Sequence, residues 1–177
     1  MAWKWKLYWL IFALTLGVYL VMVLWSLPHI AGLAGGLTPF DMRLGGYSLA
    51  EAKSFLAALP PEGVDFYLNV QHLLDMAYPA MLAVVLGIGA LGLATGRAVW
   101  IGVLAAIAAM IGAAFDYLEN AAVKGLLLVG ADEVTANAVE QASRWTLLKS
   151  GLTTVAMTLV LILLIGVVFR RWRGRQR

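Results

Sequence analysis

Four long stretches of the chain contain no charged residue, and this feature limits the possible fold more than any other. The stretches comprise residues 7–27, 76–94, 98–115 and 150–169. Each has about the ~20 residues that an α-helix needs to cross the ~30 Å hydrocarbon core of a bilayer. Because backbone polar groups in lipid must be hydrogen-bonded within the structure, a bundle of helices is expected. No segment of about ten residues alternates between apolar and polar side chains, which disfavours a transmembrane β-barrel.

The composition agrees with a membrane protein. Hydrophobic residues make up 62% of the 177 residues and charged residues 13%, whereas soluble domains are roughly half apolar and a quarter charged. We therefore predict an all-α fold in one domain over residues 1–177: an integral membrane four-helix bundle with a short amphipathic helix in its first outer loop. The predicted segments are transmembrane helices at about 7–27, 62–95, 98–129 and 133–169, an outer loop at 28–61 and a basic cytoplasmic tail at 170–177.

The distribution of basic residues predicts the orientation. Lys4, Lys6, Arg97 and the arginines of residues 170–177 fall on one side of the predicted bundle, which the positive-inside rule makes cytoplasmic. The first apolar run is longer than the core of a signal peptide, so we expect an uncleaved helix. An arginine cluster beside a transmembrane helix is typical of a topology determinant, so no nucleic-acid partner is predicted. The predicted location is the inner (plasma) membrane, multi-pass, with both termini cytoplasmic.

The predicted outer loop contains a short helix and a flexible polar segment. Ser48 and Glu51 have the spacing of a capping box, which predicts a helix over residues 49–59 that lies on the membrane surface or on the bundle. The segment before it, rich in glycine, carries Asp41, Arg43 and Tyr47. We expect this segment to fold over a site.

Residues 115–120 end the third apolar run and are the centre of the functional hypothesis. Small residues at four-residue spacing precede them and allow close helix packing in lipid. Asp116 and Asn120 continue that face and Glu119 lies beside it, so these side chains are expected inside the bundle. In the second helix, Pro79 follows Asp75 by four residues; it either makes a plain kink or frees the Asp75 carbonyl next to the Asp75 carboxylate.

Counting from the cytoplasmic helix ends, Asp75, Asp116 and Lys149 each fall ~25–30 Å along their helices. They should therefore share one polar layer near the outer interface, with Lys149 paired to Asp116 or Glu119. The predicted ligand-binding residues are Asp41, Arg43, Tyr47, His72, Asp75, Asp116, Tyr117, Glu119, Asn120, Arg144 and Lys149.

Three interpretations of this layer stay open. An isolated charge in hydrocarbon costs at least ~2.5–3.5 kcal/mol, so such residues usually pair or line a wet cavity. The layer is a salt-bridge network that locks the bundle, an outward-facing pocket, or a contact with another subunit. The small-residue helix faces could also join copies of the chain into a homo-oligomer.

An outward pocket predicts binding or transport of a small amphiphilic or cationic ligand, with membrane lipids as further partners. The alternatives are a membrane enzyme that acts on a lipid or isoprenoid, with Asp75 and Glu119 as acid/base candidates, and a structural or accessory membrane subunit. The chain has no cysteine and two histidines, which excludes thiolate chemistry. No metal motif is present, so we predict no cofactor and no metal.

Three short motifs carry a resemblance: Asp41 with Gly46-Tyr47, Asp75 with Tyr78-Pro79, and residues 116–120, Asp-Tyr-Leu-Glu-Asn. With these motifs the chain resembles an uncharacterised family of small bacterial four-helix membrane proteins. The resemblance implies the architecture of four helices and no particular activity.

Overall fold

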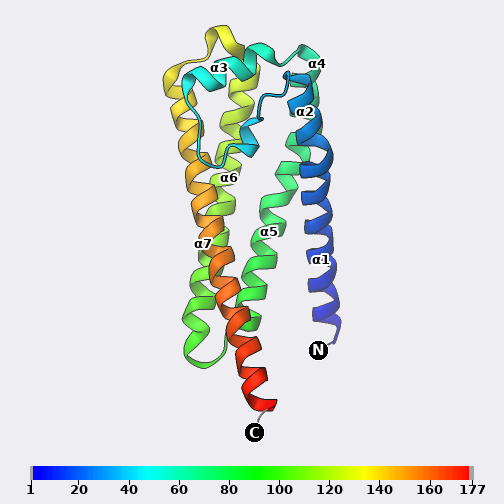
Figure 1. The fold of residues 1–177 in the computed structure, drawn as a ribbon, viewed down its shortest axis with the longest axis vertical. Helices are drawn as coiled ribbons and strands as arrows, with labels where there is room; N and C mark the ends of the chain where they lie inside the picture. The colour runs from blue at the N-terminus through cyan, green and yellow to red at the C-terminus, as the bar shows by residue number, and fades with distance from the viewer. Residues whose placement is uncertain (1, 176–177) are drawn as a thin grey trace.

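The structure is a computed structural model that describes residues 2–175, and this part of the chain contains helices and no strand (Figure 1). Four long rods lie side by side and account for most of the fold. They span Trp3–Leu33, Pro61–Leu93, Gly96–Glu133 and Ala136–Gly174, and each is long and apolar enough to cross a membrane. The predicted all-helical architecture with four long apolar helices is therefore confirmed.

Two of the rods contain a π-helical turn. The first consists of α1 (Ala2–Val21), the π turn η1 (Met22–Ser26) and α2 (Leu27–Leu33). The second consists of α4 (Pro61–Phe66), the π turn η3 (Tyr67–Gln71) and α5 (His72–Leu93). The first rod extends beyond both ends of the predicted segment 7–27, because the flanking Trp, Lys, Pro and His residues continue the helix.

The other two rods are α6 (Val99–Glu133), which follows the 3-10 turn η4 (Gly96–Ala98), and α7 (Ala136–Arg175). Gly130 has φ 78° and ψ −179°, so the regular helix is interrupted directly after residue 129, where the third predicted helix ends. Helical structure resumes as far as Glu133, and α7 begins at Ala136 rather than at residue 133. α7 also continues through the predicted tail to Arg175, because arginine is a good helix former.

Small residues bring α5, α6 and α7 together. A Cβ atom on Gly102 of α6 would lie 3.0 Å from the Ala90 carbonyl oxygen of α5, and one on Gly112 would lie 3.2 Å from Thr153 Oγ1 of α7. α1 packs mainly against α5. The small-residue face of α6 therefore packs within the chain, and it directs Asp116 and Asn120 towards the neighbouring helices.

A loop and a short helix cover one end of the bundle (Figure 1). The loop contains the 3-10 turn η2 (Phe40–Met42), and the helix is α3 (Leu49–Ala58), which begins with the predicted capping box of Ser48 and Glu51. Phe40 and Phe55 are fully buried in a cluster with side chains of α6 and α7. The loop and α3 thus rest on the bundle.

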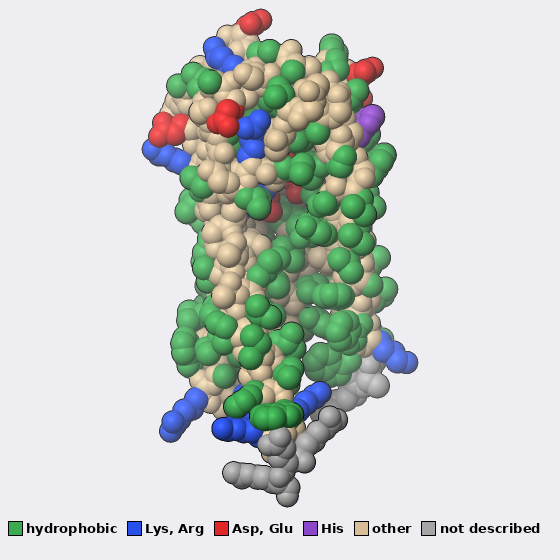
Figure 2. All heavy atoms as spheres, in the orientation of Figure 1, with side chains coloured by type: hydrophobic (Ala, Val, Ile, Leu, Met, Phe, Trp, Pro, Cys, Tyr) green, Lys and Arg blue, Asp and Glu red, His purple; other side chains and the backbone are tan. Residues whose placement is uncertain are grey.

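Charge is separated along the molecule. Both termini and the α5–α6 connection lie at the end opposite the loop (Figure 1). Lys and Arg side chains gather at that end, hydrophobic side chains dominate the middle, and acidic and basic side chains are mixed at the loop end (Figure 2). The polar layer described below lies under the loop.

Candidate functional site

Lys149 is the centre of a buried polar cluster. It extends from α7, is 8% exposed, and is the single basic side chain among the buried residues that the structure describes. Its Nζ atom lies 2.8 Å from Asp116 Oδ1 and also contacts Glu119 Oε2. The two acids are three residues apart on α6 and so occupy one helix face. The predicted pairing of Lys149 is confirmed with both acids.

The cluster extends along α6 and α7 through Glu119. This side chain is fully buried and accepts a hydrogen bond from the Thr146 hydroxyl, whose oxygen also lies 3.2 Å from the Ala142 carbonyl oxygen of its own helix. Thr146 and Lys149 are three residues apart on α7, so both reach the same carboxylate. Glu119 is therefore held by a neutral donor and a charged one.

Asp75 brings α5 into the cluster. The Asn120 side-chain amide donates to the Asp75 backbone carbonyl over 3.1 Å. That carbonyl is the group that Pro79, four residues later, leaves without its helical donor. The Asp75 side chain is 4% exposed and forms no ion pair with a base among residues 2–175. Asp75 thus contributes a carboxylate without a basic partner in the described residues.

A fourth carboxylate comes from the loop. Asp41 of η2 accepts a hydrogen bond from Gln71 Nε2 at 3.3 Å, and Gln71 Oε1 accepts one from the Ser26 hydroxyl at 2.6 Å. Gln71 and Ser26 each end a π turn, a local widening that often occurs at functional positions. Burial raises the pKa of Asp41; the charge of Lys149 opposes this and that of Asp116 adds to it.

Two buried tyrosines border the four acids. Tyr67 lies beside Asp41, and Tyr47 lies near Glu119 and Asp41. Neither hydroxyl has a hydrogen-bond partner in the part of the chain that the structure describes, although Tyr67 is 2% exposed and Tyr47 8%. Burial raises the pKa of Tyr47, and the charge of Glu119 adds to the effect. Both groups remain neutral donors that could serve a bound molecule.

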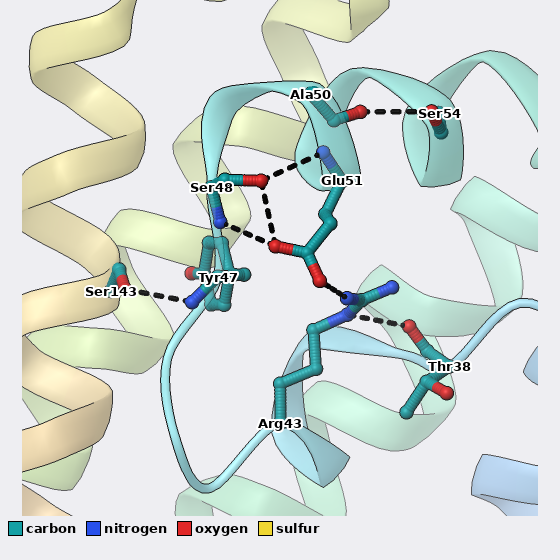
Figure 3. Close-up of polar contacts among 8 residues, drawn as sticks. All are labelled: Thr38, Arg43, Tyr47, Ser48, Ala50, Glu51, Ser54 and Ser143. Carbon is teal, nitrogen blue, oxygen red and sulfur yellow. Dashed lines mark hydrogen bonds and ion pairs between the residues drawn. The ribbon is translucent and has the colours of Figure 1, made fainter.

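The loop is fastened over the cluster by a polar network (Figure 3). Arg43 donates to the Thr38 carbonyl at 2.9 Å and pairs with Glu51 at 3.2 Å. The Tyr47 amide donates to Ser143 Oγ of α7 at 2.9 Å. Hydrogen bonds from Ser48 lower the pKa of Glu51, with a further contribution from Arg43. These contacts tie the loop to α3 and to α7.

Below the loop, the face between α7 and α1 is hollowed, and acidic side chains are visible at the upper end of the recess (Figure 2). Hydrophobic side chains surround the recess. On the α1 side, Tyr19 stacks on Tyr78 of α5 with ring centroids 5.9 Å apart, and Tyr78 lies three residues after Asp75 on the same helix. The cluster therefore has an aromatic boundary towards α1.

Four predicted site residues lie outside this cluster or at its edge. Arg144 points outwards: its side chain is 71% exposed and pairs with Glu140 one turn earlier. Five residues separate it from Lys149, which rotates it by roughly 140° around the helix. Tyr117 donates to the Met76 carbonyl at 3.0 Å and so joins α6 to α5. His72 is half-buried near Lys124, and Arg43 fastens the loop as described.

Sequence reasoning missed Ser26, Gln71, Thr146 and Tyr67. Gln71 lies one helical turn before Asp75, so the periodicity that selected Asp75 also indicates Gln71. Thr146 has the same relation to Lys149. Ser26 and Tyr67 could not be found in this way, because the π turns shift the helix faces by an amount that a regular period does not contain.

No group of three or more His, Asp or Glu side chains in residues 2–175 is arranged to hold a metal ion. No known protein family, curated protein or solved structure is significantly similar to this chain.

Proposed function

We propose that the chain crosses a plasma membrane four times, with both termini in the cytoplasm and the loop end outside. The four apolar helices support insertion. The position of Lys4, Lys6 and Arg97 at the end that also holds both termini supports the orientation. The resemblance to small bacterial membrane proteins adds the expectation of a bacterial inner membrane.

We further propose that the buried cluster binds a small cationic ligand, either for transport or for sensing. One observation supports this most strongly: among the described residues, four carboxylates, from Asp41, Asp75, Asp116 and Glu119, lie near the one buried ammonium group, that of Lys149. Within residues 2–175, Lys149 is within ion-pair distance of Asp116 and Glu119 and of no other acid. Asp41 and Asp75 thus supply acceptors that the protein does not pair with a base.

The excess of carboxylates favours binding over a purely structural lock. In an ion-pair network that only stabilises the bundle, each acid is expected to have its own base, because removing a charge from water without a partner costs several kcal/mol. A bound cation can supply the missing positive charge, as can protons. A cationic ligand does so with additional contacts, since its N–H groups can donate to the Asp75 carboxylate and to the hydroxyl oxygens of Tyr47 and Tyr67, which have no hydrogen-bond partner among the described residues.

The experiment is mass spectrometry of the gently purified protein, scanned without bias for a co-purifying small molecule. The wild type is compared with Asp116→Asn and with Glu140→Gln, a control that removes an exposed carboxylate outside the cluster. We expect a ligand with a basic nitrogen in the wild type and the control, and its loss from an Asp116→Asn variant with an unchanged circular dichroism spectrum. Equal retention in all three proteins, or an acidic ligand, would contradict the proposal.

A further inference from the structure

We propose that the ligand is an amphiphile with an alkylammonium head group, and that it reaches the cluster from the membrane through the recess between α1 and α7. This inference rests on the proposed cation binding and adds the route of entry and the chemical class of the ligand.

The route from the aqueous end is closed. Phe40 and Phe55 are fully buried where the loop and α3 meet the bundle, and Tyr47 is 8% exposed. Their rings pack against one another, with the Phe40 centroid 4.8 Å from that of Tyr47 and 5.0 Å from that of Phe55. The network of Figure 3 fastens the same segment at Arg43 and at Tyr47. A molecule that entered from the water would have to break this packing.

On the side that faces the membrane, the recess between α1 and α7 offers a more open path to the cluster. α1 packs mainly against α5, whereas α7 packs against α5 and α6. The resulting recess between α1 and α7 leads to acidic side chains and is surrounded by hydrophobic ones (Figure 2). It opens on the face of the bundle that the proposed topology turns towards lipid. An acyl chain is suited to such a wall, and a cation is suited to its upper end.

The groups at the upper end favour an organic ammonium over an inorganic cation. The four acids, which come from three segments (η2, α5 and α6), form no group fit for a metal in the described residues. The stacked Tyr19 and Tyr78 rings lie on the α1 side, where Tyr78 follows Asp75 by three residues, and Tyr67 lies beside Asp41. Carboxylates combined with aromatic rings are a common environment for ammonium groups, which are attracted to both.

The first test compares three probes by native mass spectrometry of the protein in dodecyl maltoside micelles. Dodecylammonium has the proposed head and chain, ethylammonium has the head alone, and dodecanol has the chain alone. We expect dodecylammonium to bind at a concentration at least about tenfold lower than ethylammonium, because its chain is also buried. We expect no dodecanol adduct that depends on Asp116, as judged with Asp116→Asn.

The outcomes separate the two proposals. If ethylammonium binds as tightly as dodecylammonium, the site binds cations but the inference of an amphiphile is wrong. If neither ammonium binds, the proposed function itself fails. If dodecanol binds as well as dodecylammonium, the chain alone directs binding and both proposals fail.

The second test locks the loop. A Cβ atom on Gly46 would lie 2.6 Å from Ser143 Oγ, so the double variant Gly46→Cys/Ser143→Cys is suited to a disulfide, and the chain has no other cysteine. Gly46 has φ 79°, and the reduced protein controls for the strain of that substitution.

With lateral entry, the oxidised and reduced proteins load dodecylammonium at rates within about twofold of each other. Loading that oxidation abolishes and reduction restores would establish entry through the loop and overturn the inference. The comparison of probes in the wild-type protein decides between the outcomes even if this variant does not fold.

Discussion

Replacement of Lys149 by methionine is the most direct perturbation of the cluster. Methionine has nearly the length of the lysine stem and keeps its packing, so the change mainly removes the positive charge. Lys149 interacts with Asp116 at 2.8 Å and also with Glu119. At 2.8 Å, one such pair is worth about 6 kcal/mol with an effective dielectric constant of about 20.

Part of this energy offsets the cost of burying the ammonium group, so the net effect is smaller. Removing one partner of a buried ion pair destabilises proteins by about 3–5 kcal/mol, because the other charge stays buried alone. We expect Lys149→Met to lie in this range. Glu119→Gln should cost about 1–2 kcal/mol, since glutamine can still accept from Thr146 and Lys149 keeps its pair with Asp116.

The assay is reversible unfolding in mixed dodecyl maltoside and SDS micelles, followed by circular dichroism. The double variant Lys149→Met/Glu119→Gln completes the cycle and should be more stable than Lys149→Met alone, because one of the two unpaired acids is neutralised. Arg144→Met serves as the control, since this base pairs only with the exposed Glu140 and should change stability by less than about 1 kcal/mol. Equal effects of Lys149→Met and Glu119→Gln would refute the view that one lysine serves two acids.

Three further predictions test other parts of the structure. Burial raises the pKa of Asp41 above its ordinary value of 3.8; the folded protein therefore binds more protons than the unfolded chain above about pH 4, and stability falls as pH rises. Asp41→Asn should remove this part of the decline in a series of unfolding midpoints against pH, and an unchanged slope would contradict it. Gly112→Ala should be less stable than the matched Gly125→Ala by about 1 kcal/mol or more, because the new methyl group meets Thr153 Oγ1 at 3.2 Å in the first and open space in the second; thermal unfolding measures the difference, and equal midpoints would show that α6 and α7 are not in such close contact. Finally, an impermeant maleimide should label Gly45→Cys in intact cells and Thr95→Cys only after lysis; the reverse pattern would invert the proposed topology.

The sequence allowed the helices and much of the cluster to be predicted for one physical reason. In lipid, backbone polar groups must be hydrogen-bonded within helices. The helical period then predicts the direction in which each side chain points, and the distance from the charged helix end predicts its depth. Asp116, Glu119 and Lys149 were placed together by this reasoning, and their ion pairs bear it out. Arg144 was misplaced because closeness along the chain was given more weight than its rotation around α7.

The contributions of the loop and the π turns could not be predicted with the same means. Asp41 reaches the interior because Phe40 anchors its turn in a core of aromatic side chains from α3 and α4, and no periodic pattern encodes such a long-range contact. The residues Ser26 and Gln71 meet because each of their helices widens by one residue per turn at the same level. Sequence patterns predict the regular helices, whereas the groups around Asp41 are held by the loop and the π turns, which are irregular.

The regular and the irregular elements contribute different groups to the cluster. A structural ion pair needs only the regular helices, and Lys149 with its two acids is complete on α6 and α7. Asp75 and Asp41 add acidic groups without a base, and they reach the cluster through a proline-freed carbonyl, two π turns and a loop packed into the bundle. Such departures from regular geometry cost stability, and in membrane helices they are tolerated where other groups satisfy the backbone. Their convergence on surplus carboxylates at the end of a recess is the arrangement expected of a binding site. If the cluster were only a structural ion-pair network, Asp75→Asn would change the stability of the protein little and would remove no ligand. In a cation-binding protein, the same variant would keep its fold and lose its ligand.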